Sequence, residues 1–479
     1  MAEREFIEAT LNKVGVDPLA HGRHGPEFFA SAELYLDGGR MAAPTKRWLA
    51  YAMIRDQIRR IKGSTLARNA AWMFAGQGLS LVVQGLSFVI LARLLGSGQY
   101  GVLAAAYALI SMVSQYSAMG SGTLFMRYVS QDHSRFREYW GNILLSIAML
   151  GTPLVLALHW GGVWLIGSAS ASVLVLLAIG DCLCLQLVAC ISQIFQTFEK
   201  MQITATLNLL TNFLRLLLAA GMLVVLHHAT AWQWAIASLT ISIIAVATAF
   251  ATVMIKFGRP KFVFKLLLTR LGEGFIFAAS GSTTSVYNDI DKVMLGHYGM
   301  TVANGIYAMA YRVVNICTMP MASIYAAAFP RFFREGLNGV RSTEPLARKL
   351  LKRTLVMAIL GAVGMFVLAP LIPYLVGKGF SQSVAALRWL CLIPVFRSLH
   401  VSAADAMAGA GHQKYRFVSQ FIAAASNFCM NLYLIPRYSW QGAAWASLLT
   451  DGGLAAMNWT VLLWLKRNES VGQPIIDLA

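Results

Sequence analysis

YGVLAAAYALISMVSQYSAM, residues 100–119, is a run of twenty residues without a charged side chain. The hydrocarbon core of a bilayer is about 30 Å thick, and about 20 apolar residues of helix span it. The run therefore predicts a membrane-spanning helix. Eleven further stretches of comparable length are predicted at residues 71–93, 140–159, 170–195, 202–226, 232–255, 274–297, 304–330, 354–376, 383–407, 415–435 and 440–465.

The composition agrees with a membrane protein. Of the 479 residues, 57% are hydrophobic and 13% are charged, whereas about 25% are charged in a typical soluble domain. A net charge of +18 would suggest nucleic acid as the partner of a soluble protein. Here the basic residues fall at helix ends, where lipid headgroups explain them, so membrane lipids and not nucleic acid are expected as partners. All six cysteines lie within apolar stretches, and no disulfide framework is expected.

Lysine and arginine predict which side of the membrane each end faces. Twenty-five of them fall in segments on the amino-terminal side of the membrane, whereas the opposite side has only Arg93, Lys378 and Arg437. This asymmetry places both termini in the cytoplasm. The outer connections are short, which disfavours a membrane polymerase or glycosyltransferase because such enzymes generally need a larger extramembrane region.

The chain also repeats itself faintly. Residues 101–107 (GVLAAAY) parallel residues 305–311 (GIYAMAY), Asn212 parallels Asn427, and Trp232 parallels Trp440. The offsets of 204, 215 and 208 residues correspond to six helices, which preserves orientation across the membrane. We therefore predict an all-α integral membrane fold, with twelve transmembrane helices in two parallel-repeat six-helix bundles around a central cavity.

This organisation predicts five segments. Residues 1–66 form a cytoplasmic extension that is disordered or carries a basic interfacial helix at residues 47–62. A start at Met41 or Met53, without the preceding stretch, is the alternative. Residues 67–256 form the first bundle, and residues 257–273 a cytoplasmic linker. Residues 274–466 form the second bundle, and residues 467–479 a cytoplasmic tail.

Charged side chains within the predicted helices mark candidate cavity residues, because each needs a partner or water inside the membrane. Arg215 follows Asn208 and Asn212 at the i, i+4, i+7 spacing of one helix face. Arg397 also lies near the middle of its helix. Asp181 and Asp451 are possible partners for either arginine.

The seventh and eighth helices carry a second set of charges. Asp289, Asp291 and Arg312 are expected at matching depths of about 9–12 Å from the outer ends of neighbouring helices, and Lys292 is three residues from Asp289. These groups form either a structural ion pair or one that breaks during transport. Arg127, at the inner end of the second helix, either meets an anionic headgroup or anchors the inner leaflet.

Guanidinium groups in a cavity favour an anionic substrate, since they bind phosphate bidentately. A nucleotide-binding loop, a metal motif and a cofactor fingerprint are not recognisable in the sequence. We therefore expect a transporter rather than an enzyme, without a cofactor or a metal.

Several stretches together resemble the Wzx-type polysaccharide flippases of the multidrug/oligosaccharidyl-lipid/polysaccharide exporter superfamily. They are residues 66–72 (LARNAAW), 91–101 (LARLLGSGQYG), 120–123 (GSGT) with Arg127, 291–296 (DKVMLG) and 305–312 (GIYAMAYR). The resemblance implies a bacterial inner-membrane protein that moves polyprenyl-diphosphate-linked oligosaccharide from the inner to the outer leaflet. The glycan would serve O-antigen, lipopolysaccharide, capsule or exopolysaccharide synthesis, with glycan polymerase or export proteins as partners.

The resemblance also implies site residues. Arg215, Arg312 and Arg397 are of the type that lines the family's cavity, with Asn212 and Arg127 as further substrate-binding candidates. Asp289 and Asp291, with Lys292, are candidates for gating or for coupling to a proton or sodium gradient. Two alternatives remain open at this point: a cation-coupled drug or metabolite antiporter of the same superfamily, and a membrane glycosyl polymerase.

Overall fold

The computed structural model describes residues 65–469, with the side chains of residues 78–469 other than 280, 284 and 330. The predicted interfacial helix at residues 47–62, the rest of residues 1–64 and the tail from residue 470 lie outside the described residues. The chain divides into two units after Trp72. The account below concerns the second unit, and residues 65–72 enter only as the start of the helix α4.

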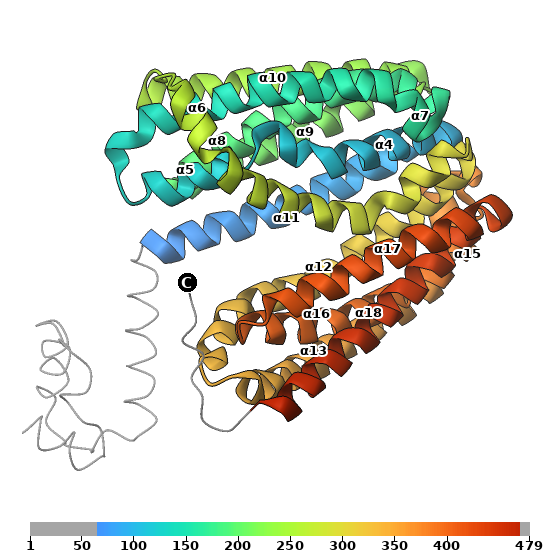
Figure 1. Cartoon of the computed structure of the whole chain (residues 1–479). Helices are drawn as coiled ribbons and strands as arrows, with labels where there is room; N and C mark the ends of the chain where they lie inside the picture. The colour runs from blue at the N-terminus through green and yellow to red at the C-terminus, as the bar shows by residue number, and fades with distance from the viewer. Residues whose placement is uncertain (1–64, 470–479) are drawn as a thin grey trace, which may run out of the picture. The chain divides into compact units, whose positions relative to one another are not determined.

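The part of the chain that the structure describes is helical and contains no strand (Figure 1). The first half comprises α4 (Thr65–Ala118), α5 (Ser121–Val129), η1 (His133–Arg135), α6 (Phe136–Ser146), η2 (Ile147–Gly151), α7 (Thr152–Ala178), η3 (Ile179–Leu185), α8 (Gln186–Thr197), α9 (Met201–Leu226) and α10 (Ala231–Phe257). The second half comprises α11 (Phe264–His297), α12 (Thr301–Gly336), α13 (Val340–Leu368), η4 (Ala369–Leu371), α14 (Ile372–Val376), η5 (Lys378–Phe380), α15 (Ser383–Leu390), α16 (Ile393–Gly409), α17 (Gln413–Tyr438) and α18 (Trp440–Asn468).

All twelve predicted stretches are helical, although several are joined or broken differently from the prediction. The first two form the single element α4, which is broken at Gly96. The third and fourth run from α6 to α8 with a break at Gly167. Both glycines have positive φ, 66° and 74°, which side chains with a Cβ rarely adopt. Each break therefore lets the chain turn with a very short connection.

Seven segments within the described residues are long and apolar enough to cross a membrane. Two of them, at residues 78–118 and 133–197, each hold two predicted helices. Three predicted helices, α11, α12 and α18, are not among these seven segments. They contain many of the polar residues described below, which lower their hydropathy. Their length is sufficient, at 34, 36 and 29 residues.

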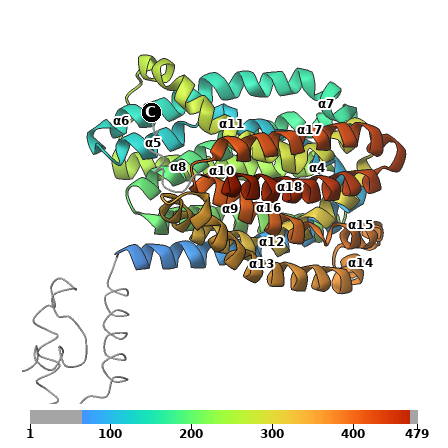
Figure 2. The ribbon, with the colours of Figure 1, turned by 60° about the horizontal axis from the view of Figure 1, so that its bottom comes forward.

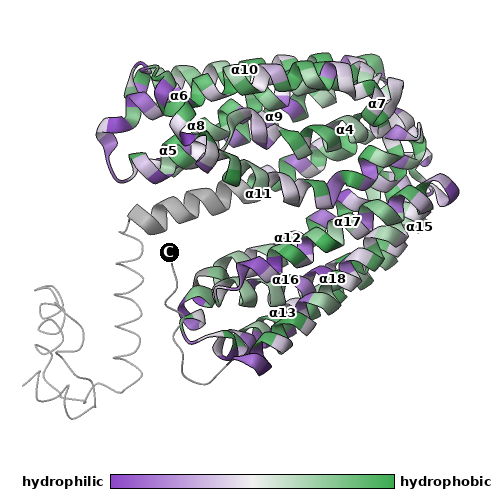
Figure 3. Ribbon diagram, viewed as in Figure 1, coloured by the Kyte–Doolittle hydropathy of each residue, from purple (hydrophilic) through white to green (hydrophobic). Residues whose placement is uncertain are grey.

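Apolar side chains are exposed on the outer faces of the helices. Trp164 is 82% exposed, Ile255 84% and Val225 76%. Figure 3 shows hydrophobic residues along most of α10 and hydrophilic ones at the connection between α5 and α6. A surface this apolar is suited to lipid and not to water. The chain is a multi-pass membrane protein.

Apolar clusters form the core of each half, and two of them also include a residue of the other half, Ala92 and Val293. One first-half cluster surrounds Leu103 and Leu174, and another surrounds Trp140 and Phe195. In the second half, α17 and α18 pack side by side (Figure 1, Figure 2), and α16 packs against α12, α13 and α18. The helix α11 contacts α5, α6 and α7 of the first half as well as α12 and α17 of the second. It therefore joins the two bundles.

The two copies of the repeated motif meet each other. A Cβ added to Gly101 on α4 would lie 1.7 Å from the Thr301 carbonyl oxygen on α12, and one added to Gly305 would lie 1.9 Å from the Ser97 carbonyl oxygen on α4. Each glycine thus packs on the carbonyl four residues before the other glycine. Such reciprocal contact is what a twofold axis between the halves produces. Small residues allow the helix backbones to approach this closely.

We predict that Gly101→Ala and Gly305→Ala each destabilise the protein, because a methyl group cannot share the position of a carbonyl oxygen. The expected loss is about 1–3 kcal/mol, typical of overpacking, or more. Thermal unfolding of the detergent-solubilised protein measures it. Gly85→Ala is the control, since the added methyl group would meet no described atom within 4 Å beyond its chain neighbours and the adjacent backbone of its own helix. Equal melting temperatures for Gly101→Ala and Gly85→Ala would contradict the prediction.

Candidate functional site

A cavity of about 510 Å³ lies between the two halves of the second unit, lined by α4, η3, α8, α11 and α12. Its charged lining residues are Asp181, Asp289, Lys292 and Arg312. Tyr107 and Gln186 from the first half and Tyr311 and Asn315 from the second also line it. Three of the predicted site residues, Asp289, Lys292 and Arg312, therefore line one cavity.

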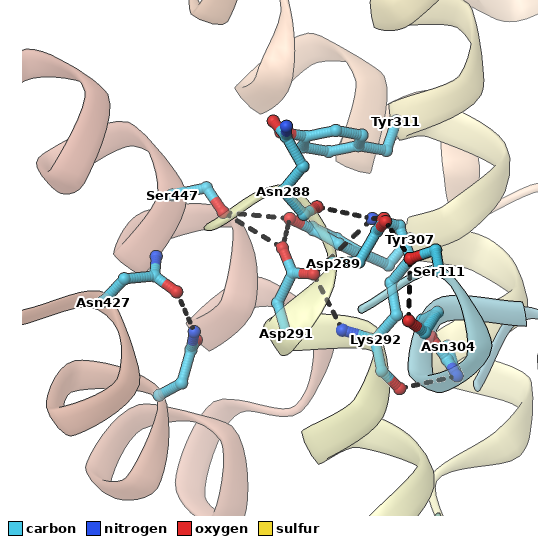
Figure 4. A network of polar contacts seen from close by, with 12 residues as sticks. Ser111, Asn288, Asp289, Asp291, Lys292, Asn304, Tyr307, Tyr311, Asn427 and Ser447 are labelled. Carbon is cyan, nitrogen blue, oxygen red and sulfur yellow. Dashed lines mark hydrogen bonds and ion pairs between the residues drawn. The ribbon is translucent and has the colours of Figure 1, made fainter. Parts of the chain in front are cut away.

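Lys292 is the centre of a polar network on α11 (Figure 4). Its Nζ lies 2.8 Å from Asp289 Oδ1 and 3.6 Å from Asp291 Oδ1, and it donates to the backbone carbonyl of Asn288 at 2.9 Å. The second Asp289 oxygen accepts a hydrogen bond from Ser111 Oγ on α4 at 2.8 Å. Lys292, and not Arg312, is thus the cation that pairs with these carboxylates.

Asp291 ties α11 to two further helices. Its carboxylate accepts hydrogen bonds from Tyr307 on α12, from Ser447 on α18 at 3.3 Å, and from the backbone N–H of Lys292 at 2.8 Å. Asn304 Nδ2 donates to the carbonyls of Gly101 and Lys292, both at 3.0 Å. The network therefore fastens α4, α11, α12 and α18 together. A gating or ion-coupling role for Asp289, Asp291 and Lys292 stays a prediction.

Arg312 occupies a different environment. Its side chain is exposed to the cavity, with the guanidinium carbon 5.9 Å from the centre of the Phe88 ring. Among the described residues Arg312 makes no ion pair. A guanidinium at this depth without a carboxylate depends on water or on an anionic ligand for its stabilisation.

Arg397 on α16 lies behind the cavity wall. Its guanidinium donates to Asn288 Oδ1 at 3.0 Å, to the Tyr311 hydroxyl at 3.2 Å and to Asn315 Oδ1 at 3.4 Å. Two of these acceptors, Tyr311 and Asn315, themselves line the cavity. All three acceptors are neutral, so hydrogen bonds stabilise the Arg397 guanidinium without cancelling its charge. Its positive electrostatic potential therefore extends to the cavity that Tyr311 and Asn315 line.

Arg215 on α9 also lies outside the lining, behind Asp181. Its Nη2 is 3.8 Å from Asp181 Oδ1, which is one of the pairings that the sequence left open. Its neighbour Asn212 donates to Ser80 on α4 at 3.2 Å. The other candidate partner, Asp451, contacts Tyr287 and lies 3.6 Å from His400. The structure does not bring Asn212 to the cavity.

Arg127 lies in the last turn of α5, the helix that follows α4 in the chain. It forms an ion pair of 2.7 Å with Glu273 on α11, and Tyr128 donates to the same carboxylate at 3.0 Å. Arg127 is 56% exposed, and Glu273 is also within 3.3 Å of Arg270. This cluster links α5 to α11 away from the cavity lining.

Sequence reasoning missed Gln186 and Tyr107 as cavity residues. Gln186 follows η3, a π-helical segment of seven residues that contains Asp181. In an α-helix a residue five positions on lies about 140° around the axis. In the wider π turn, residues five apart return toward one face. A π segment has no strong sequence signature, so this arrangement was not predictable.

A profile of the family described as "Polysaccharide biosynthesis protein" matches residues 66–335, more than half of the chain. The chain belongs to this family. The family predicted from the motifs is therefore confirmed, and the match includes both copies of the glycine motif as well as Asp289, Lys292 and Arg312.

One curated relative of this polysaccharide biosynthesis protein is named "Probable flippase AglR", from Haloferax volcanii. It is 28% identical over 176 residues, covering 34% of the chain described here and 35% of the relative. The match thus spans about a third of the relative's length.

Solved structures show the fold more completely. A lipid II flippase MurJ in an inward closed conformation has a TM-score of 0.64 at 15% identity, covering 85% of this chain and 94% of the other. An inward-facing multidrug resistance MATE transporter of the MOP superfamily has a TM-score of 0.63 at 12% identity, covering 83% and 100%. The predicted twelve-helix fold of that superfamily is confirmed.

We predict that Lys292→Met destabilises the protein strongly, because it leaves Asp289 and Asp291 without a cation inside the membrane. Breaking a buried pair in this way costs about 3–5 kcal/mol. Adding Asp289→Asn should restore part of that loss, as a double-mutant cycle measured by thermal unfolding would reveal. Lys265→Met, at an exposed position of α11, is the control. No recovery in the double variant would contradict the assigned pairing.

Proposed function

We propose that the protein is a flippase that moves polyprenyl-diphosphate-linked oligosaccharide from the inner to the outer leaflet of the cytoplasmic membrane by alternating access. The observation that carries the proposal is Arg312, a cavity-lining guanidinium without an ion-pair partner among the described residues. Family membership and the flippase named among the relatives support it.

The chemistry of the cavity suits a diphosphate. Guanidinium presents paired N–H donors that match two phosphate oxygens, and the contact is strengthened where water is excluded. Arg397 lies outside the lining but donates hydrogen bonds to the lining residues Tyr311 and Asn315, so it makes the electrostatic potential in the cavity more positive. The carboxylates Asp289 and Asp291 on α11 pair with Lys292, and neither makes an ion pair with Arg312 in the described part of the chain.

The direction and location follow from the proposed topology. The excess of lysine and arginine on one side supports cytoplasmic termini in a bacterial inner membrane. The substrate would enter from the leaflet where it is made. A glycan polymerase or export protein on the outer side would use the product for O-antigen, capsule or exopolysaccharide.

The contacts between the halves suit alternating access. In the described chain, the close glycine contact joins α4 and α12, while α11 contacts both bundles. Rocking of one bundle against the other would open the cavity to each side in turn.

A cation-coupled drug antiporter is the second candidate, because Asp181 and Asp289 also line the cavity and the fold is shared with multidrug transporters. Arg312 disfavours it, since a cationic drug would meet an uncompensated guanidinium. The antiporter would be favoured if the protein exported a cationic dye in vesicle assays and if Asp289→Asn and Asp291→Asn each abolished this export.

We predict that cells lacking this protein retain lipid-linked glycan in the cytoplasmic leaflet, and that Arg312→Ala fails to restore its transfer. Loss of hydrogen bonds to a charged ligand corresponds to about a tenfold or larger loss of rate. The transfer can be measured in vesicles that contain the purified protein and a fluorescent polyprenyl-diphosphate glycan. The readout is the fraction of glycan that becomes accessible to a lectin added outside the vesicles.

Arg388→Ala is the matched control. Arg388 lies on α15, outside the cavity lining, with its guanidinium carbon 5.0 Å from the centre of the Phe366 ring. It should transfer the glycan at the wild-type rate. An unchanged leaflet distribution in the deletion strain would refute the proposed function.

A further inference from the structure

The carboxylate of Asp181 is the most unusual group in the cavity. It accepts no hydrogen bond within residues 65–469, and its closest charged partner, Arg215 Nη2, is 3.8 Å away, beyond hydrogen-bond distance. By contrast, Asp289 accepts hydrogen bonds from Ser111 and Lys292, and Asp291 from Tyr307 and Ser447. Asp181 alone among these three carboxylates has all its acceptor sites available.

The backbone that carries Asp181 is nevertheless firmly packed. Its neighbours Gly180 and Cys182 are buried, and η3 contacts α7, α8, α10 and the other π-helical segment, η2. Leu183 on η3 would lie 2.6 Å from a Cβ on Gly151 of η2. The backbone at Asp181 is therefore held in place by packing, as a recognition site requires of its supporting element.

Two further residues line the cavity beside Asp181. Gln186 makes no side-chain hydrogen bond in the part of the chain that the structure describes, and it lines the same cavity. It can donate two hydrogen bonds and accept two. The ring of Tyr107 lies in the lining as well. We name Tyr107, Asp181 and Gln186 the η3 wall.

The charges around the η3 wall exclude most ligand classes. A phosphate group would be repelled by the Asp181 carboxylate. A cation would face the Arg215 guanidinium behind Asp181, and Lys292 and Arg312 in the same cavity. A neutral ligand with several hydroxyl donors fits, because hydroxyls donate to the carboxylate, exchange hydrogen bonds with the amide and leave an apolar face for the tyrosine ring.

We infer that the η3 wall binds the sugar next to the diphosphate and selects which sugar the protein accepts, an inference that rests on the proposed function. A cavity of about 510 Å³ is within the usual range for a site that encloses one small ligand, about 300–1,000 Å³. One lipid-linked headgroup can therefore contact Arg312 with its diphosphate and Asp181 with its sugar. Arg215 is a positioning residue, since its guanidinium attracts the carboxylate from outside the lining.

Binding to the purified full chain in detergent tests the inference. The probes are polyprenyl diphosphate without sugar, and the same lipid carrying one glucose, galactose or N-acetylglucosamine. The wild-type protein should bind at least one sugar-bearing lipid about tenfold more tightly than the bare lipid, as hydrogen bonds to a charged group predict. Asp181→Asn and Gln186→Ala should each lose most of that gain. Gln186→Ala, which removes no charge, should also bind the bare lipid as the wild type does.

Asp405→Asn is the matched control. Asp405 is a buried carboxylate that pairs with Arg416 at 3.3 Å, but it does not line the cavity. This variant should keep the full gain from the sugar. For the positioning role, Arg215→Lys should retain the gain and Arg215→Gln should lose it, with binding of the bare lipid equal in both.

The outcomes separate the two proposals. If the wild-type protein binds none of the polyprenyl diphosphates, the proposed function itself fails. If it binds the bare and sugar-bearing lipids equally, or if Asp181→Asn and Gln186→Ala both keep the gain from the sugar, the inference that the η3 wall binds the sugar is wrong. The proposed function is not contradicted by either result. Because Gln186→Ala removes no charge, it keeps the test valid where Asp181→Asn does not fold.

Discussion

The backbone contact between Gly101 and Gly305 sets the distance between the two halves, and the cavity depends on that distance. Neither glycine can carry a side chain, since each packs directly on a carbonyl of the opposite helix. Arg312 lies seven residues beyond Gly305, or about 10 Å along α12. Tyr107 and Ser111 lie on the corresponding part of α4. On α12 the cavity lining begins at Ala308, three residues beyond Gly305, and on α4 it includes Tyr100, beside Gly101. A change in the glycine contact would therefore move both walls.

The low dielectric of the membrane explains how the charges are distributed. Asp289, Asp291 and Lys292 satisfy one another and fasten four helices together. Groups that remain open, such as Arg312 and Asp181, face the cavity, where water or a ligand can reach them. An open cation and an open anion in one cavity are suited to a ligand with a negative and a neutral polar part. A diphosphate joined to a sugar has this character.

Part of the candidate site was predictable because a charge in an apolar stretch is conspicuous. That signal found Arg312, Asp289 and Lys292, which line the cavity. It also found Arg397 and Arg215, but not their position behind the lining, since that depends on Tyr311, Asn315 and Asp181 on other helices. Gln186 carries no charge and was missed. Its place in the lining depends on the π turn that precedes it.

The sequence by itself determined the twelve helices and the repeat, because about twenty apolar residues must span a bilayer and six-helix offsets preserve orientation. The motif that begins at Gly101 and returns at Gly305 was visible in the same way. Only the tertiary structure decided that these two glycines touch. It also decided which carboxylates are satisfied and which one stays open. Hydrogen bonds and ion pairs between helices depend on how the helices rotate and pack, and hydrophobic patterning within one helix does not specify that.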